Sequence, residues 1–232
     1  MQKWKRVKSS CVVAFHEAFT TKAFEDDCTP PTLRELMIAI VFVYDYHADS
    51  KSLAQLHFSN ESPFGKQHRS SQHYHHHNPT MIPEKIIWGY IVQIATGLKT
   101  IHDQGLACRV IDLSTLLVTS DRRVRLNCCG ITDVIAPMPE NRIPGEKLLD
   151  LVNFGRYMLC LAVSSQEAFH DPARWIEVVK RRSGNLAGAL SYLINLEQNT
   201  TRNINEFLAN ISDIMVTYVD ASLQYLSHSY TF

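Results

Sequence analysis

The residues of this chain that could do chemistry are concentrated between Leu106 and Gly130. Among its candidate residues are Arg109, the carboxylate of Asp112, the hydroxyls of Ser114 and Thr115, and the thiols of Cys108, Cys128 and Cys129. Two short apolar runs, 116–118 and 124–126, flank a polar tip and predict a β hairpin. The chemistry to consider is that of a carboxylate that orients a hydroxyl group and of ligands that hold a metal ion against phosphates.

The spacing of these residues matches a protein-kinase catalytic loop followed by a metal-binding loop. In kinases a His-Arg-Asp triplet orients the attacking hydroxyl, and an Asn and an Asp-Phe-Gly motif further along hold magnesium. Aligned without gaps, the triplet becomes Cys108-Arg109-Val110, the Asn becomes Thr115, and the last motif becomes Cys128-Cys129-Gly130. The base and both metal ligands are therefore replaced.

These replacements predict a site that does not transfer phosphate. Valine at position 110 accepts no proton, and loss of a general base typically removes ~10²–10⁴ in rate. Magnesium prefers hard oxygen ligands, whereas the thiol of Cys128 is soft. The scaffold residues Arg109 and Gly130 are kept. One alternative stays open: a divergent, weakly active kinase that uses Asp112 as the base, although Cys128 still stands where a carboxylate is needed.

The flanking segments predict an α+β, protein-kinase-like fold with a partial small β lobe and a mostly helical large lobe. Residues 12–20 and 41–46 are rich in β-branched and aromatic side chains, which is typical of strands. Asp45, Tyr46 and His47 would form the hinge between the lobes. The segment 28–40 between the two strands looks inserted, and the sequence does not decide whether it is a short helix.

Helical periodicity predicts most of the large lobe. Pro83 begins a helix over 84–102 with one broad apolar face, and Gly105 ends it. Further helices are expected at about 185–196 and 204–214. The periodicity continues through 215–226 and predicts the start of a linker helix.

Two residues outside the loops are expected to be structural. Asp150 opens a predicted helix over 150–159 and should accept hydrogen bonds from the catalytic-loop backbone, because a buried carboxylate needs donors. Arg202 stands where kinases keep an arginine that pairs with the glutamate of an Ala-Pro-Glu motif. In this chain Met138-Pro139-Glu140 is the counterpart of that motif.

Composition bounds the remaining function classes. Lysine plus arginine equals aspartate plus glutamate, 23 each, so no global field draws the chain to nucleic acid or membrane. The longest apolar run, 36–44, is about half a membrane span, and no signal peptide is visible. The cysteines lack CxxC spacing and lie in apolar contexts, which favours buried thiols in a reduced cytosolic or nuclear setting.

The predicted organisation has four parts: a partial small lobe and hinge at 1–58, a polar loop at 59–80, the helical lobe at 81–214 and the start of a linker or coiled-coil helix at 215–232. The loop carries a histidine cluster at 73–77. It lacks the spaced second ligand pair of a structural zinc site, so no metal site is expected.

Several strings resemble the pseudokinase subunit of the poly(A)-nuclease deadenylation complex. They lie at 13–19, 41–47, 91–95, 109–112 and 125–130, and the resemblance covers most of residues 4 to 222. The string Arg-Leu-Asn-Cys-Cys-Gly at 125–130 is quite specific. Against that family's pattern the Gly-rich phosphate loop, the strand lysine, the poly(A)-binding-protein motif and the C-terminal knob are missing, so the chain resembles a copy truncated at both ends.

The resemblance implies a non-catalytic subunit that recruits and stimulates the catalytic exonuclease subunit in cytoplasmic mRNA poly(A)-tail shortening, including in P-bodies. Its implied partners are that exonuclease, poly(A)-binding protein, tryptophan-rich silencing proteins, a second copy joined by a coiled coil, and RNA through a local patch. No membrane partner is expected. A helical scaffold fragment without a ligand is the third reading.

The resemblance also implies ATP that is bound but not hydrolysed. The family's nucleotide contacts fall here on Asp45, Tyr46, His47, Ala48, Asp49, Ser50, Lys51, Ser52, Ser114 and Thr115. Thr115 replaces the lysine of a Ser-Lys pair, and the phosphate loop is missing, so weak binding is expected. An alternative is that Tyr46 and His47 only pack in the hinge.

Overall fold

The computed structural model describes residues 2–22, 38–59, 81–119, 123–195 and 202–229. The expected polar loop at 59–80 and most of the apparent insertion at 28–40 lie outside these ranges.

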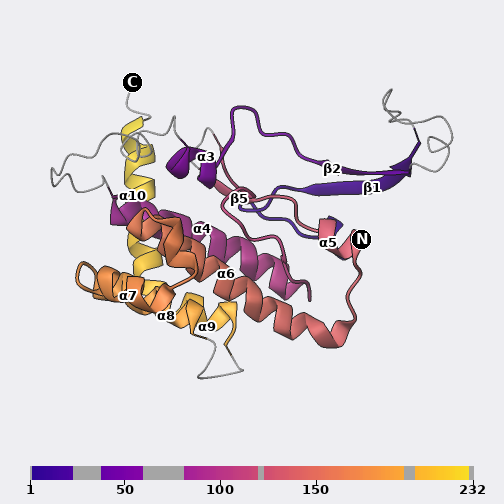
Figure 1. Cartoon of the computed structure of the whole chain (residues 1–232). Helices are drawn as coiled ribbons and strands as arrows, with labels where there is room; N and C mark the ends of the chain where they lie inside the picture. Colours follow the sequence, from indigo (N-terminus) through magenta and orange to yellow (C-terminus); the bar gives the residue numbers. More distant parts are fainter. Residues whose placement is uncertain (1, 23–37, 60–80, 120–122, 196–201, 230–232) are drawn as a thin grey trace, which may run out of the picture.

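A helical body forms the larger part of the molecule (Figure 1). Two long helices, α4 (Glu84–Asp103) and α6 (Ile143–Val163), run through its centre. Helices α7 (Pro172–Lys180), α8 (Gly184–Ile194) and α9 (Ile204–Asn210) pack against them. This arrangement confirms the predicted mostly helical lobe.

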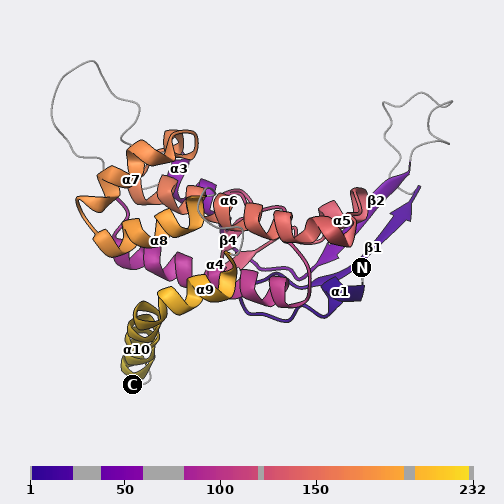
Figure 2. The same cartoon turned by 90° about the horizontal axis from the view of Figure 1, so that it is seen from below.

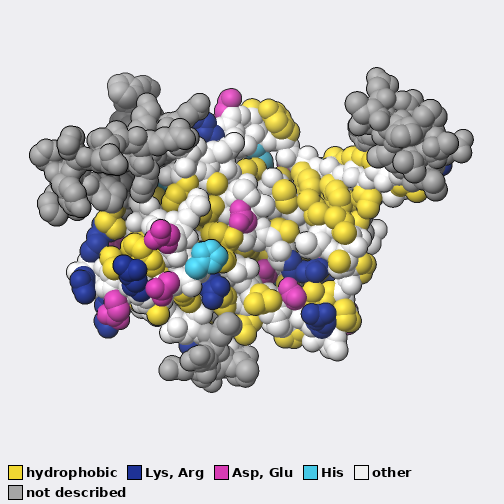
Figure 3. Space-filling view, in the orientation of Figure 1, with side chains coloured by type: hydrophobic (Ala, Val, Ile, Leu, Met, Phe, Trp, Pro, Cys, Tyr) yellow, Lys and Arg dark blue, Asp and Glu magenta, His cyan; other side chains and the backbone are white. Residues whose placement is uncertain are grey.

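The small lobe is represented by an antiparallel pair, β1 (Phe15–Thr21) and β2 (Ala39–Tyr44), with Phe19 opposite Val41. The pair projects from the body on the side opposite α7 and α10 in both views (Figures 1 and 2). Hydrophobic side chains gather on its visible face (Figure 3). Both strands were predicted, although the first begins three residues later than expected.

The second sheet joins the lobes at the site. Its strands are β3 (Lys51–Ser52), β4 (Leu116–Val118) and β5 (Val124–Leu126), paired antiparallel in the order β3-β4-β5. The predicted hairpin is therefore confirmed. Val12, expected in the first strand, instead bridges to Leu126 and ties the small lobe to β5.

Several short elements were not predicted. They are α1 (Gln2–Lys5), α3 (Leu53–Phe58), α5 (Ile131–Ile135) and two 3₁₀ turns at 140–142 and 166–169. Helix α3 begins at a capping box, in which Oγ of Ser52 accepts from the backbone N–H of Gln55 while the Gln55 side chain accepts from Ser52. Helix α7 was also missed.

The chain ends in α10 (Ser212–Ser229), a single helix over the region where the end of one helix and the start of another were expected. Its first turns pack on α4, where Tyr218 lies against Gly89. From there the helix leaves the body (Figure 2). In the parts of the chain that the structure describes, no helix is both long and apolar enough to span a bilayer.

The core lies between α4, α6 and α8. Phe154 on α6 is fully buried and meets Phe207 of α9 edge-on, with ring centroids 6.0 Å apart. Gly155 lets α6 approach α8 closely, since a Cβ there would lie 2.6 Å from Cβ of Leu193. This tight contact fixes α6, which carries Asp150 beneath the catalytic-loop segment.

Candidate functional site

The catalytic-loop and metal-loop segments meet at Thr115. Its hydroxyl donates to the carbonyl of Val110 at 2.5 Å, and its own carbonyl accepts from the backbone N–H of Asn127 at 3.1 Å. Cys128 follows directly. The three residues aligned with the base and the two metal ligands therefore lie in adjacent segments, as the kinase alignment predicts. These two segments, residues 108–115 and 127–130, are called the floor of the site below.

Asp150 holds this floor from below. The carboxylate is 2% exposed, and it accepts from the backbone N–H groups of Cys108 (2.6 Å) and Arg109 (2.8 Å). It also accepts from Nε2 of His102 at 2.9 Å. Arg109 has φ +62°, a left-handed conformation that costs free energy and needs such support. The predicted structural role of Asp150 is confirmed.

The retained scaffold residue Arg109 contacts an unpredicted partner, Asp133 of α5. Nη1 of Arg109 donates to Oδ1 of Asp133 at 2.8 Å, and the indole N–H of Trp4 donates to Oδ2 at 2.7 Å. Glu146 lies 3.8 Å from Nε of Arg109. Gly130, at φ +90°, lies under the indole, where a Cβ would be 3.2 Å from Trp4. Asp133 thus ties α1, the catalytic-loop segment and α5 together.

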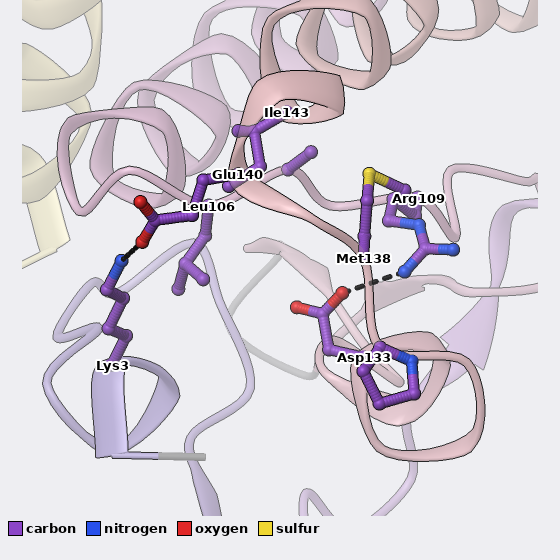
Figure 4. Close-up of a pocket in the computed structure, with 9 residues that line it drawn as sticks. Lys3, Leu106, Arg109, Asp133, Met138, Glu140 and Ile143 are labelled. Atoms are coloured by element: carbon purple, nitrogen blue, oxygen red, sulfur yellow. Dashed lines mark hydrogen bonds and ion pairs between the residues drawn. The ribbon is translucent and has the colours of Figure 1, made fainter.

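A cavity of about 180 Å³ lies beside this cluster (Figure 4). Its rim carries two ion pairs, Arg109 with Asp133 and Lys3 with Glu140, and its wall includes Leu106, Met138 and Ile143. Its lining comes from α1, the catalytic-loop segment and residues 133–143, and not from the stretch predicted to hold nucleotide.

Two cysteines of the floor are buried free thiols. Cys108 and Cys129 are buried, with Sγ atoms 3.7 Å apart, and the phenol of Tyr44 donates to the Cys129 carbonyl at 2.8 Å. Burial, and then the nearby Cys129, raises the pKa of the partly exposed Cys128 thiol. A protonated thiol at the position of the Asp-Phe-Gly aspartate does not suit magnesium.

Asp112 is engaged in local hydrogen bonds. Its Oδ1 accepts from the backbone N–H of Ser114 at 2.7 Å, and its Oδ2 accepts from the phenol of Tyr157 at 2.6 Å. Partial burial acts to raise the pKa of the Asp112 carboxyl, but the bonds from Ser114 and Tyr157 outweigh it and lower that pKa below its ordinary value. A base with a lowered pKa is poorly matched to proton abstraction at neutral pH.

The predicted nucleotide contacts lie mostly in the connection from β2 to β3. Asp45, Tyr46, Ala48, Asp49 and Lys51 are exposed, and Asp45 pairs with His16 at 2.6 Å. Ser52 departs from the prediction: it is buried and its hydroxyl caps α3, so it is a structural residue. Ser114 is exposed, whereas the Thr115 hydroxyl is used within its own loop.

The expected pairing of Arg202 with Glu140 is wrong. Nη1 of Arg202 donates to the carbonyls of Tyr192 (2.7 Å) and Asn195, and the guanidinium lies 5.1 Å from the Tyr192 ring centroid. Glu140 instead accepts from Lys3 at 3.5 Å. The physical reason is the C-terminal end of α8, whose last carbonyls have no partners within the helix and draw a cation.

Over the described ranges, no group of three or more His, Cys, Asp and Glu side chains lies close enough to hold a metal ion.

The comparisons with known proteins give a consistent result, although no protein-family model matches the chain. PAN3 subunits of the PAN2–PAN3 deadenylation complex from Aspergillus oryzae and Coccidioides immitis are both 36% identical over 225 residues, which is 96% of this chain and 31% of each relative. The chain thus spans about a third of the length of these curated relatives.

Solved structures are also similar to this chain. The Drosophila melanogaster PAN3 pseudokinase aligns with a TM-score of 0.79 at 29% identity, over 98% of this chain and 56% of that one. Neurospora crassa PAN3, solved in complex with PAN2, aligns with a TM-score of 0.78 at 29% identity, over 98% and 51%. Together with the kinase-like floor built around Asp150, these matches identify the chain as PAN3-like, with the kinase-like fold of the PAN3 pseudokinases.

Proposed function

We propose that this chain is the non-catalytic regulatory part of a poly(A)-nuclease deadenylation complex. Its role is to recruit and stimulate the catalytic exonuclease subunit during cytoplasmic mRNA poly(A)-tail shortening. The observation that carries the proposal is an intact kinase floor, held by Asp150, in which Val110, Thr115 and Cys128 replace the base and both metal ligands. The names of the curated relatives support the complex.

The absence of phosphate transfer is tested with magnesium, labelled ATP and a generic protein substrate. Incorporation at the level of a protein-free control is expected. Asp112→Ala is the matched variant, because Asp112 is the base in the alternative reading. Magnesium-dependent incorporation that this variant abolishes would establish a divergent kinase instead.

Nucleotide binding is proposed as weak, without hydrolysis and independent of magnesium. Tyr46 is 88% exposed and could stack on a base, and Nε2 of His47 has no hydrogen-bond partner among the described residues. Calorimetry with ATP, with and without magnesium, should give the same weak affinity, and Tyr46→Ala should weaken it. Unchanged binding in that variant would favour a hinge-packing role for Tyr46.

The proposed partners follow from the family. A solved relative is in complex with PAN2, so capture of the exonuclease subunit by residues 1–232 is the direct test. Failure to capture it would favour the helical-scaffold reading.

Poly(A)-binding protein, the tryptophan-rich silencing proteins, RNA and residence in P-bodies are proposed for the whole protein. A second copy is proposed to join through α10, where Val216 and Val219 are 70% and 51% exposed.

A further inference from the structure

Two thiols on separate loops of the floor face each other. Cys108 lies in the catalytic-loop segment and Cys129 in the segment after β5, with their Sγ atoms 3.7 Å apart. The side chains are 0% and 1% exposed. Cys128 and Cys129 are adjacent in the sequence, but the fold brings Cys129 to a thiol on another loop.

The separation is short enough for a covalent bond. A disulfide has an S–S length of about 2.05 Å, so each sulfur has to move by less than about 1 Å. The loops themselves are anchored nearby, since Asp150 accepts from the Cys108 N–H and Tyr44 donates to the Cys129 carbonyl. The two sulfurs are therefore close enough for small movements to bring them to bonding distance.

We propose that Cys108 and Cys129 form a reversible redox pair, whose oxidation to a disulfide cross-links the catalytic-loop and metal-loop segments. The closed loop of chain would contain Ser114, Thr115 and the hairpin of β4 and β5. The cross-link would therefore lock the floor of the cleft under oxidising conditions. This inference does not depend on nucleotide binding or on any partner.

The oxidant is a hydroperoxide, which is small enough to reach a buried thiol. One thiolate attacks a peroxide oxygen, the O–O bond breaks, and a sulfenic acid and water result. The second sulfur then attacks the sulfenic sulfur, the S–O bond breaks, and the hydroxyl leaves as water with the second thiol's proton. Two thiols lose two electrons and two protons, and hydrogen peroxide becomes two waters.

The surroundings set the rate of this step. The hydrogen bond with Cys129, and then burial, raises the pKa of the Cys108 thiol well above its ordinary value. Since the thiolate is the reactive form, oxidation should be slower than at an exposed cysteine. The pair would respond to sustained rather than brief oxidation.

The test uses the full chain, residues 1–232, reduced and then treated with hydrogen peroxide at neutral pH. Free thiols are alkylated in denaturant without reductant, and tryptic peptides are analysed by mass spectrometry. The expected product joins peptide 100–109 to peptide 126–142, is two hydrogens lighter than their sum and disappears on reduction. Fragmentation of the wild-type product assigns the sulfur without any substitution.

Variants give a second assignment, because the later peptide also contains Cys128. Cys128→Ser should keep the link and Cys129→Ser should lose it, while Cys160→Ser is the control for a buried thiol outside the pair. A link through Cys128, or oxidation to sulfenic and sulfinic acids without any link, would overturn the proposal.

Thermal melting gives an independent readout. A cross-link that the native floor accommodates should raise the melting temperature by about 5–10 °C, because it restricts the unfolded chain, and reduction should restore the lower value. An oxidised chain that contains the link but melts at the same or a lower temperature would show that the native floor does not accept it, and would overturn the proposal.

Discussion

At the scale of single residues, one carboxylate shapes the degenerate site. Asp150 gathers two backbone donors and one imidazole, and so holds Arg109 in a left-handed conformation. Nothing in this arrangement requires catalysis. It explains how the kinase-like floor keeps its shape with Val110, Thr115 and Cys128 at the positions aligned with the base and the metal ligands.

Asp150→Asn should lower the free energy of unfolding by about 2–3 kcal/mol, because the amide offers one acceptor where three donors converge. Urea denaturation followed by circular dichroism measures the change. The matched control is Asp103→Asn, whose carboxylate is exposed and pairs with Lys99, and whose loss should cost less than about 0.5 kcal/mol. Equal effects of the two variants would contradict this account of Asp150.

His57 makes the stability depend on pH. Burial lowers the pKa of its imidazole from 6.5 to about 4, and Nε2 lies 3.1 Å from the hydroxyl of Tyr90. As the pH falls below 6.5, the unfolded chain takes up a proton at His57, whereas the folded chain takes it up only near pH 4. The free energy of unfolding should therefore decrease as the pH falls from 6.5 to about 4. Urea midpoints at pH 7 and pH 5 should differ less in His57→Gln than in the wild type. An identical pH response would contradict the expected role of His57.

At the scale of elements, the sequence predicted those with a clear apolar pattern. Helix α4 repeats apolar side chains over five turns, and the hairpin of β4 and β5 has apolar runs on both sides of a polar tip. Helices α1, α3 and α5 are four to six residues long, too short for a periodicity to be read, and distant contacts stabilise them. Trp4 of α1 bonds to Asp133 of α5, a contact no local pattern reveals.

The residues of the site also divide into those that the sequence predicted and those that it missed or misassigned. Asp150 was predicted from its place at the start of a helix, whereas Asp133 stood in no predicted element. Arg202 was misassigned because the kinase pattern gave its usual partner, while the structure places it at the end of α8. Ser52 was read as a ligand contact, although its position before Gln55 also matches a capping box. Local capping could have been recognised from the sequence.

The close contact between Gly89 of α4 and Tyr218 of α10 gives a prediction at the scale of elements. A Cβ at Gly89 would lie 3.0 Å from the ring of Tyr218, whereas a Cβ at Gly188, also within a helix, would meet nothing within 4 Å. Gly188→Ala should therefore gain up to about 1 kcal/mol of stability from helix propensity. Gly89→Ala should lose this gain and speed amide hydrogen exchange in α10. Unchanged exchange there would show that Tyr218 does not seat α10.

At the scale of the whole molecule, surface composition limits how copies could associate. The formal net charge is zero, so long-range attraction contributes little and contact must come from local apolar surface. Such surface occurs on the hairpin of β1 and β2, where Phe19 and Ile40 are 46% and 45% exposed (Figure 3). It also occurs on α10 at Val216 and Val219.

The proposed pairing of two copies through α10 predicts that Val216→Glu combined with Val219→Glu weakens self-association by at least about tenfold, because two charges would enter an apolar interface. Sedimentation equilibrium measures the dissociation constant. Phe19→Glu on the hairpin is the control, and it should leave the constant unchanged. The reverse pattern would place the interface on the hairpin.

The seating of Tyr218 against Gly89 has a mechanical consequence. Helix α10 has 18 residues and so extends about 27 Å, but its described contact with α4 is confined to its first turns. Ile214, Met215 and Tyr218 pack these first turns against the core, and Tyr218 is the furthest along the helix of these three. Ser229 lies 11 residues beyond Tyr218, about 16.5 Å at this rise per residue, so a tilt of 10° at Tyr218 displaces that end by roughly 3 Å. A single methyl group added at Gly89 in α4 could therefore redirect the end of α10.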